Sequence, residues 1–297
     1  LSRIPPRKEI RRNAPLELPH IMVLINDAKR SVIEPLANKT DTLEKVYDTE
    51  LMANGGHLSA WKVDRQEDLQ AIALAVEAMH AELDPSNPLL FAMGDGNHSL
   101  ATAKSCWEDI KQGLSEDGRK NHPARYALVE LENIFDPGLA FEPIHRVLFN
   151  ISRQTFLEEI AKVCESYVVS KASSKEEVLQ QINVNDGLQK FGYCDAEGFL
   201  VIGMRESKAS IAAGTLQLVI DSLLAQKLAT VDYIHGVEVA ANLGKKKGNI
   251  ALILPDVSKA TFFDTIIKDN TLPRKTFSMG EASDKRFYFE CRQIQYI

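Results

Sequence analysis

The sequence predicts an α/β fold of the α+β kind, in which helices flank a mixed β-sheet. Three observations predict this class. First, 44% of the 297 residues are hydrophobic and 26% are charged, which suits one large or two ordinary globular domains. Second, amphipathic segments with the 3.6-residue period of helices occur between short apolar runs typical of strands. Third, helices and strands do not alternate strictly, which favours a mixed sheet over a doubly wound parallel one.

The N-terminal segment comes first in chain order. Residues 1–15 are rich in Arg and Pro, and Pro5-Pro6 favours extended backbone, so we expect an arm or linker rather than a helix. The Ile- and Val-rich run 20–25 predicts a buried strand. Further strands are expected at 31–36 and, after a glycine turn, at 57–63.

A helix, a buried strand, a glycine turn and a second helix are expected next. Apolar residues at helical period predict a helix over 64–83, which Asp84-Pro85 ends. The wholly apolar run 88–93 predicts a central strand buried on both faces. The second helix is expected to begin at Ser99, a competent N-cap residue.

Further strands and helices are expected after the second helix. Strands are predicted at 125–131, 143–149, 249–254 and 286–294, a hairpin at 190–194 and 199–204, and helices at 156–163, 176–182, 216–229 and 257–267. The lobe boundary is placed near Asn150. Residues 1–150 then carry the glycine turn, and residues 151–297 form the lobe that packs against them.

Composition narrows the function. Lys and Arg number 35 against 41 Asp and Glu, for a net charge of −6, so direct nucleic-acid binding through a basic surface is not favoured. The four cysteines are far apart and lack the two-residue spacing of zinc knuckles or redox dithiols. We therefore expect a reduced, cytoplasmic protein. No segment approaches 18 uncharged apolar residues, so no membrane-spanning helix is predicted.

The most informative stretch is Gly94-Asp95-Gly96-Asn97-His98-Ser99, between the predicted strand and helix. Free N–H groups and the positive end of the dipole at a helix N-terminus attract anions. Glycine allows the tight turn and the close approach of a ligand. Asp95 can hold a divalent ion or accept a hydroxyl proton, and His98 can donate to phosphate or transfer a proton.

The pattern has a simpler interpretation as well. It is not a Walker loop, which needs G-x-x-x-x-G-K-[ST], and it lacks the third glycine of the dinucleotide fingerprint. A tight strand-to-helix turn without any ligand would use the same residues. The alternatives of an anion site and a plain turn therefore stay open on the pattern alone.

The segment FAMGDGNHSLATAK resembles the domain-of-unknown-function family 1015, whose members have A-D-G-H-H-R or G-D-G-N-H-S there. The resemblance continues through RIPPRKEIRRNAPLELPHIM, EPIHRVLF, DYIHG and LPRKTFSMGEA, and so covers essentially the whole chain. Family members usually carry a further N-terminal segment, and this chain begins at Leu1 rather than Met. The resemblance thus implies a fragment that lacks an N-terminal segment.

The D-G-x-H-[RS] element is similar to the phosphate-binding motif of the ParB/sulfiredoxin superfamily, which includes free-serine kinases and CTP-binding partition proteins. Family members also tend to be encoded beside serine-biosynthesis enzymes. The resemblance implies nucleotide-dependent phosphoryl transfer to a small hydroxylated metabolite such as serine, with ATP or ADP and Mg²⁺. Ser99 stands where the superfamily usually has Arg, so either another cation supplies that charge or the affinity for nucleotide is reduced.

Candidate site residues follow from the turn and the resemblance. Asp95 and His98 are the candidate catalytic residues, and Asp95 is also the candidate metal ligand. The candidate cofactor-binding residues are Gly94, Gly96, Asn97, Ser99, Lys104, His145, Arg146, His235, Lys275 and Thr276. Arg3 and Arg7 of the arm are further cations. Consecutive strand residues face opposite sides, so only one of His145 and Arg146 can enter a given pocket.

Two other functions remain open. The same turn would suit a phosphatase-type hydrolase acting on phosphoserine, which needs no nucleotide. It would also suit a regulator that binds nucleotide without turnover. The partners in every case are small molecules, with homo-oligomerisation left open.

Overall fold

The computed structural model describes residues 4–270, 272–273, 275–279 and 287–296. The chain divides into two compact units. Unit 1 comprises residues 1–139 and 281–297, and unit 2 comprises residues 140–280. Unit 2 begins at residue 140, ten residues before the boundary expected near Asn150. The C-terminal residues 281–297 belong to unit 1 and not to the second unit. Among the described helices, none has the length and apolarity that crossing a membrane requires.

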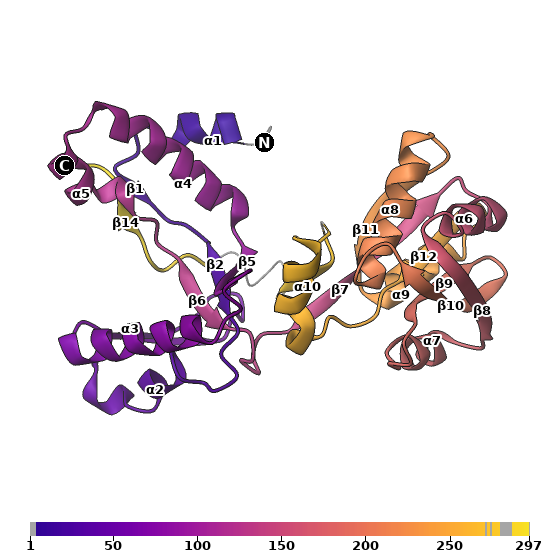
Figure 1. The fold of residues 1–297 in the computed structure, drawn as a ribbon, viewed down its shortest axis with the longest axis horizontal. Coiled ribbons are helices and arrows are strands. Elements are labelled where there is room, and N and C mark those ends of the chain that lie inside the picture. The colour runs from indigo at the N-terminus through magenta and orange to yellow at the C-terminus, as the bar shows by residue number, and fades with distance from the viewer. Residues whose placement is uncertain (1–3, 271, 274, 280–286, 297) are drawn as a thin grey trace. The chain divides into compact units, whose positions relative to one another are not determined.

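Unit 1 contains short sheets and five described helices (Figure 1). The helices are α1 (Ile4–Arg11), α2 (Glu34–Ala37), α3 (Gln66–Ala81), α4 (Asn97–Ile110) and α5 (Glu116–Asn121). The strands are β1 (Leu16–Glu17), β2 (Met22–Ile25), β3 (Glu44–Glu50), β4 (His57–Lys62), β5 (Phe91–Asp95), β6 (Glu130–Asn133) and β14 (Arg292–Gln293). Strand β2 is antiparallel to β5 and parallel to β6, so the sheet that carries the glycine turn is mixed.

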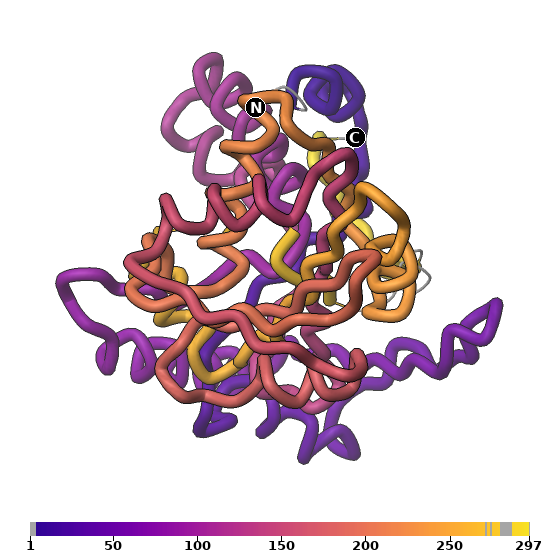
Figure 2. Tube along the Cα trace, turned by 90° about the vertical axis from the view of Figure 1, so that its right-hand side faces the viewer, coloured from indigo at the N-terminus to yellow at the C-terminus, as the bar shows by residue number. Residues whose placement is uncertain are grey.

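Unit 2 is built on one antiparallel sheet in the order β11-β7-β12-β9-β10-β8, with β13 pairing the start of β7. Its strands are β7 (Phe141–Phe149), β8 (Cys164–Ala172), β9 (Gln189–Asp195), β10 (Gly198–Ser207), β11 (Thr230–His235), β12 (Asn249–Ile253) and β13 (Phe277–Met279). Its helices are α6 (Arg153–Ile160), α7 (Lys175–Ile182), α8 (Ala212–Ala225), α9 (Val237–Gly244) and α10 (Phe262–Asp269). The chain can be followed in Figure 2 by its colour, from magenta at β7 to orange-yellow at α10.

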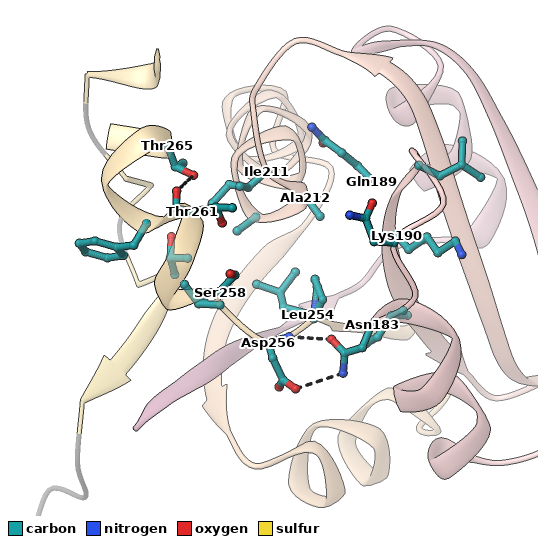
Figure 3. Close-up of a pocket in the computed structure, with 18 of the residues that line it drawn as sticks. Asn183, Gln189, Lys190, Ile211, Ala212, Leu254, Asp256, Ser258, Thr261 and Thr265 are labelled. Carbon is teal, nitrogen blue, oxygen red and sulfur yellow. Dashed lines mark hydrogen bonds between the residues drawn. The ribbon is translucent and has the colours of Figure 1, made fainter. Parts of the chain in front are cut away.

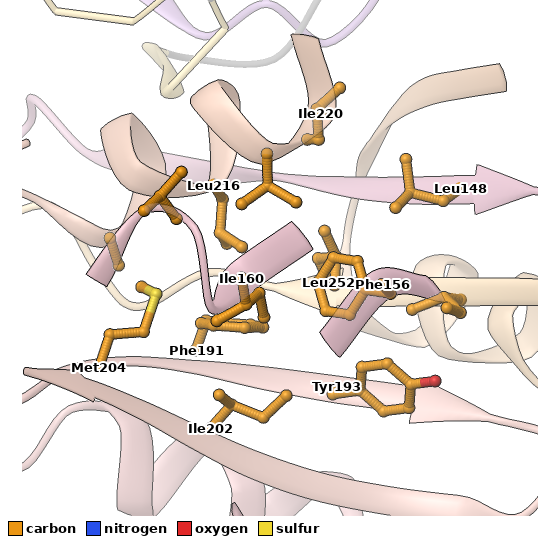
Figure 4. Packing of buried hydrophobic residues seen from close by; sticks show 14 of the residues in the cluster. Leu148, Phe156, Ile160, Phe191, Tyr193, Ile202, Met204, Leu216, Ile220 and Leu252 are labelled. Atoms are coloured by element: carbon orange, nitrogen blue, oxygen red, sulfur yellow. The ribbon is translucent and has the colours of Figure 1, made fainter. Parts of the chain in front are cut away.

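Helices cover both faces of this sheet. Helices α6 and α8 pack on one face, where Phe156, Leu216 and Ile220 meet Phe191 and other buried strand residues (Figure 4). Helices α7 and α9 supply Val178 and Ala240 and their neighbours to the opposite face. Unit 2 therefore has three layers, with the sheet in the middle, and burial of this apolar surface is its main source of stability.

The predicted α+β class is confirmed, and so are most of the predicted elements. The strand at 20–25 is β2, and the strand at 143–149 is β7. The long helix at 64–83 is α3, and the hairpin is β9–β10. These segments have either clear periodicity or a strong turn signal, which local sequence determines well.

Several local predictions are wrong. The strand expected at 125–131 is only β6 (Glu130–Asn133), and of the strand expected at 286–294 the described residues form only β14 (Arg292–Gln293). Residues 4–11 form helix α1 instead of an extended arm, because Pro5 and Pro6 occupy the first turn, where no N–H partner is required. The strand expected at 31–36 is replaced by α2. The apolar run at 88–93 ends in β5, an edge strand whose Phe91 is 45% exposed, rather than a central one. The helix after the turn begins at Asn97, two residues before Ser99.

Candidate functional site

Gly96 fixes the geometry of the glycine turn in unit 1. It follows the last residue of β5 and is the N-cap of α4, with φ of 82°. A Cβ at this position would lie 2.2 Å from the carbonyl oxygen of His20 and 2.7 Å from Cα of Ile21. Only glycine fits both the backbone conformation and the space. The turn is therefore held directly against the start of β2.

The N-terminus of α4 is open to a ligand. Its N-cap residue, Gly96, has no side chain, so no side-chain cap bonds to the first-turn N–H groups, and the first turn contains no acidic residue. Asn97, His98 and Ser99 are all exposed. Ser99 is the third residue of the helix and does not cap it, contrary to the sequence prediction. These features make the end of α4 electropositive.

Asp95 adds a carboxylate at the same turn. Its Oδ1 accepts a hydrogen bond from the N–H of Gly96 at 2.7 Å. In the sheet, Asp95 pairs with Met22, and Met22 pairs on its other side with Glu130. Two carboxylate-bearing residues thus flank Met22 in one row of the sheet. No group of three described metal-binding side chains is close enough to form a metal site unaided.

A pocket of about 310 Å³ lies beside the first turn of α4 and is lined by Ser99 and Thr102 from that helix and by Arg7 and Arg11 from α1. Arg11 is largely buried, and its Nε donates to Glu17 at 2.7 Å. Its Nη2 is buried and has no hydrogen-bond partner among the described residues. Arg7 is exposed at the pocket. Arg11 is thus already paired with Glu17, which lines the same pocket, and Arg7 is the exposed guanidinium there.

A second pocket of about 310 Å³ in unit 1 shares Pro19 and Ile21 with the first and is largely aromatic. Tyr47 stacks with Phe289 at 6.1 Å between ring centroids. The Tyr47 hydroxyl donates to Glu290 at 2.7 Å, and burial, followed by this bond, raises the pKa of Tyr47 to about 12.

His20 lines the aromatic pocket, and its buried Nε2 has no partner among the described residues. Its ring meets Tyr288 edge-on at 6.2 Å. No sequence motif distinguishes His20, and only the fold shows that its Nε2 lacks a partner among the described residues. The carbonyl oxygen of His20 also lies against Gly96, so the pocket and the turn share this residue.

Glu132 is a further titratable residue that sequence reasoning missed. Burial, and then the neighbouring charge of Glu130, raise the pKa of Glu132 to about 7. It lies on β6 opposite Leu24, two residues along the strand from Glu130. A carboxyl group that titrates near neutral pH is a candidate proton acceptor.

The remaining predicted site residues belong to unit 2, apart from Lys104, which is exposed on α4 and lines neither unit 1 pocket. His145 and Arg146 are buried neighbours on β7, and His235 is exposed at the end of β11, across from Ile144. Burial, followed by the charges of Arg146 and His235, lowers the pKa of His145 to about 4. Its Nδ1 accepts from the N–H of Leu254 at 3.2 Å.

Lys275 and Thr276 lie just before β13. Lys275 is exposed and Thr276 is buried, with its hydroxyl donating to the carbonyl of Pro273 at 2.7 Å. The structure thus brings Gly94 to Ser99 together in unit 1, and groups Arg146 with Lys275 at Tyr233 in unit 2. That the two groups serve one ligand stays a prediction. Arg3 lies outside the described residues.

Thr276 also lines a cavity of about 250 Å³ in unit 2, between α8, α10 and the chain after β12 (Figure 3). Its polar side chains already bond to one another. Asn183 and Asp256 share two hydrogen bonds of 3.0 and 3.1 Å, and Gln189 donates to the carbonyl of Ala209 at 2.6 Å. None of the lining side chains is a buried polar group without a partner. This cavity is therefore a weaker candidate than the turn in unit 1.

The chain is similar to known proteins both in sequence and in structure. The family model described as "Protein of unknown function (DUF1015)" matches residues 1–224. A structure of free serine kinase in complex with AMP has a TM-score of 0.44 and 14% identity, covering 78% of this chain and 86% of that chain. A variant of free serine kinase in complex with ADP has the same TM-score at 13% identity, covering 78% and 86%.

A conserved hypothetical protein from Pyrococcus furiosus has a TM-score of 0.40 and 11% identity, covering 95% of this chain and 98% of that chain. Among curated proteins, none matches this sequence. Structural similarity at this level carries over neither the activity nor the ligands of those proteins.

Proposed function

This chain belongs to the DUF1015 family, and we propose that its Gly94–Ser99 turn binds the phosphate groups of a nucleotide. The proposed reaction is nucleotide-dependent phosphoryl transfer to a small hydroxylated metabolite such as serine. The observation that carries the proposal is the uncapped N-terminus of α4, whose Ser99 lines a pocket together with Arg7 and Arg11. Main-chain N–H groups and guanidinium groups are the donors that phosphates prefer.

Each residue of the turn has a distinct role in this proposal. The N–H groups of Asn97, His98 and Ser99 bond to phosphate oxygens. The exposed His98 side chain donates to the transferred group, whose charge must be stabilised in the transition state. Asp95 accepts the proton of the attacking hydroxyl or holds Mg²⁺.

Asp95 would hold a magnesium ion between its carboxylate and the bound phosphate. A carboxylate and a phosphate at the same turn repel each other, and a divalent cation between them removes that repulsion. Mg²⁺ in phosphate sites is commonly held by one or two carboxylates together with the phosphates, so a single carboxylate suffices. The ion would supply charge neutralisation of the transferred phosphate.

The aromatic pocket beside the turn suits the base of the nucleotide. Phe289 stacks with both Tyr47 and Phe287, and a base would add to this group of rings, since stacking on aromatic rings accommodates any base. The unpartnered Nε2 of His20 offers a polar contact at the same place. The two pockets share Pro19 and Ile21, so one nucleotide would reach both with its base and its phosphates.

Isothermal titration calorimetry with ATP, ADP and inorganic phosphate tests the proposal. We expect binding that Arg7→Gln weakens about tenfold or more, since a hydrogen bond to a charged group contributes roughly 1.5–3 kcal/mol. Arg12→Gln is the matched control, because Arg12 is exposed on the same segment but lines a different pocket. Absence of binding by all three ligands, or equal weakening by both variants, would contradict the proposal.

Turnover separates the proposed transfer from the two alternatives. Transfer requires a nucleotide, so serine incubated with ATP or ADP should be phosphorylated, and Asp95→Asn should abolish this. Phosphate release from phosphoserine without nucleotide would favour a hydrolase. Nucleotide binding without any turnover would favour a regulator.

A further inference from the structure

Arg146 of unit 2 carries a positive charge in the protein interior that no described residue pairs with an opposite charge. Its side chain is 0% exposed. Nη1 donates to the carbonyl of Ile144, whereas Nε and Nη2 are buried without a partner among the described residues. A buried charge without a partner costs several kcal/mol as an order of magnitude. A residue that costs so much stability needs a compensating partner.

Arg153 of the same unit has a partner of this kind, the carboxylate of Asp195. Arg153 lies 5.5 Å from the Tyr193 ring and uses Nε and Nη2 to hold Asp195 at 2.9 and 2.7 Å. Tyr193 donates its hydroxyl to the same carboxylate at 2.8 Å. Nε–H and Nη2–H form one edge of the guanidinium, which matches two oxygens of one carboxylate or phosphate.

Arg146 repeats this arrangement without the carboxylate. It pairs directly with Tyr233 in the sheet, and its guanidinium lies 5.4 Å from that ring. Asp195 stands two residues after Tyr193, but His235 stands two residues after Tyr233. The Tyr233 hydroxyl donates to Gln217 at 3.3 Å instead. In Arg153, the Nε–Nη2 edge of the guanidinium binds Asp195. In Arg146, the same edge binds no carboxylate among the described residues.

A second cation lies at the same ring. Lys275 is exposed, and its Nζ is 4.9 Å from the centre of the Tyr233 ring. No described carboxylate forms an ion pair with Lys275 or with Arg146. Two positive charges around one half-buried ring produce a positive potential that attracts an anion. Burial lowers the pKa of Arg146 to about 10.

We propose that Arg146 anchors an oxyanion subsite in unit 2, in which Nε–H and Nη2–H bind two oxygens of a carboxylate or phosphate group on a small ligand. Lys275 and Tyr233 form the outer side of the subsite, because they are exposed and half-buried respectively. The ligand reaches Arg146 by displacing these side chains. The subsite is independent of the turn in unit 1, so it holds whether or not that turn binds a nucleotide.

The Arg146 Nε–H resonance in ¹⁵N-correlated NMR spectra of the 297-residue chain tests the subsite directly, since Arg146→Met identifies the signal by its disappearance. Inorganic phosphate and acetate are titrated separately, each against chloride at equal ionic strength. We expect a saturable shift with at least one of the two oxyanions, and the stronger ligand identifies the class. A signal that does not move, or moves equally with chloride, would overturn the proposal.

Two variants and a matched control complete the test. Lys275→Gln should weaken oxyanion binding at Arg146 by up to about fivefold, as expected for an exposed charge. Lys245→Gln should not change it, although Lys245 lies at a similar 5.1 Å from the Phe199 ring in the same unit. Arg7→Gln should also leave it unchanged, which separates this subsite from the pocket in unit 1.

Thermal unfolding distinguishes a ligand anchor from a structural residue. Without oxyanion, Arg146→Met should raise the melting temperature, because an apolar side chain of similar size replaces an unpaired buried charge. If oxyanion raises the melting temperature of the unaltered chain, Arg146→Met should abolish that rise, whereas Arg7→Gln should retain it. A melting temperature lowered by Arg146→Met, with the oxyanion response retained, would assign Arg146 a purely structural role.

Discussion

Gly96 shows how one residue can determine a site. The sequence pattern predicts a sharp turn there, and the structure explains why glycine is required. Its φ of 82° and the carbonyl oxygen of His20, 2.2 Å from a would-be Cβ, exclude other side chains. The pattern predicts the turn because glycine's freedom is local. It could not reveal His20, because that contact joins segments 76 residues apart in the sequence.

Replacement of Gly96 by Ala should destabilise unit 1 more than the backbone angle alone explains. A left-handed residue with a Cβ costs roughly 1–2 kcal/mol, and the clash with His20 adds to this. Gly248→Ala is the control, because Gly248 has φ of 82° but open space around its would-be Cβ. Urea unfolding should show a clearly larger loss for Gly96→Ala. Equal losses would show that the close contact with His20 has no energetic consequence.

His145 should make the stability of unit 2 depend on pH. Its pKa is lowered to about 4 in the folded chain from an ordinary value of 6.5, so the unfolded chain binds the proton more readily. Stability is unaffected by this group above pH 6.5 and falls as pH decreases toward 4, by about 3 kcal/mol in total. Protonation of Nδ1 would also remove the acceptor for Leu254.

Denaturant unfolding between pH 4 and 7 measures this effect. His145→Asn keeps a hydrogen-bond acceptor but cannot titrate, so the fall in stability between pH 6.5 and 4 should become shallower. The exposed His80→Asn serves as the control and should retain the wild-type slope. An unchanged slope in His145→Asn would contradict the assignment.

Two residues that line the unit 1 pockets, and Glu132, which lines neither pocket, could not be predicted from the sequence. Arg11, His20 and Glu132 have no distinguishing motif, and each matters because of burial or a missing partner in the fold. The sequence predicts an extended arm over residues 1–15, so it gives no reason to expect Arg11 at a pocket. The glycine turn itself indicates Asp95 and His98, but neither the turn nor the family resemblance shows which cation accompanies Ser99.

At the scale of elements, periodicity predicts what local sequence determines. Helix α3 and the β9–β10 hairpin match the prediction within a few residues. Helix α1 was missed because Pro5-Pro6 suggests extended backbone, although proline is tolerated in the first helical turn. The position of β5 at a sheet edge depends on strand pairing, which the apolar run 88–93 does not encode.

The corrected start of α4 leads to a prediction about Ser99. Because Ser99 is not the N-cap, Ser99→Ala should leave the free energy of unfolding nearly unchanged, while it weakens phosphate binding at the pocket it lines. Ser152→Ala is the comparison, since Ser152 caps α6 by accepting from the N–H of Thr155 at 3.1 Å. Its loss should cost about 1 kcal/mol. Similar stability losses in the two variants would show that Ser99 also caps its helix.

At the scale of the whole molecule, the chain uses two units with separate chemistry. Unit 1 holds the glycine turn with its two pockets, and unit 2 holds a three-layer core with a buried arginine. The sequence predicted two lobes but placed the boundary near Asn150, inside the connection that follows β7. Strand β7 belongs to unit 2 because it pairs with β11 and β12, and only tertiary pairing determines that membership.

The most direct measurement of the central claim is the response of the backbone amides of Asn97, His98 and Ser99 to ADP in ¹⁵N-correlated NMR spectra. If the turn binds the phosphates, these three signals shift saturably, inorganic phosphate shifts them in the same direction, and Arg7→Gln requires a higher ADP concentration for the same change. Signals that stay in place while ADP binds elsewhere in the chain would contradict this claim.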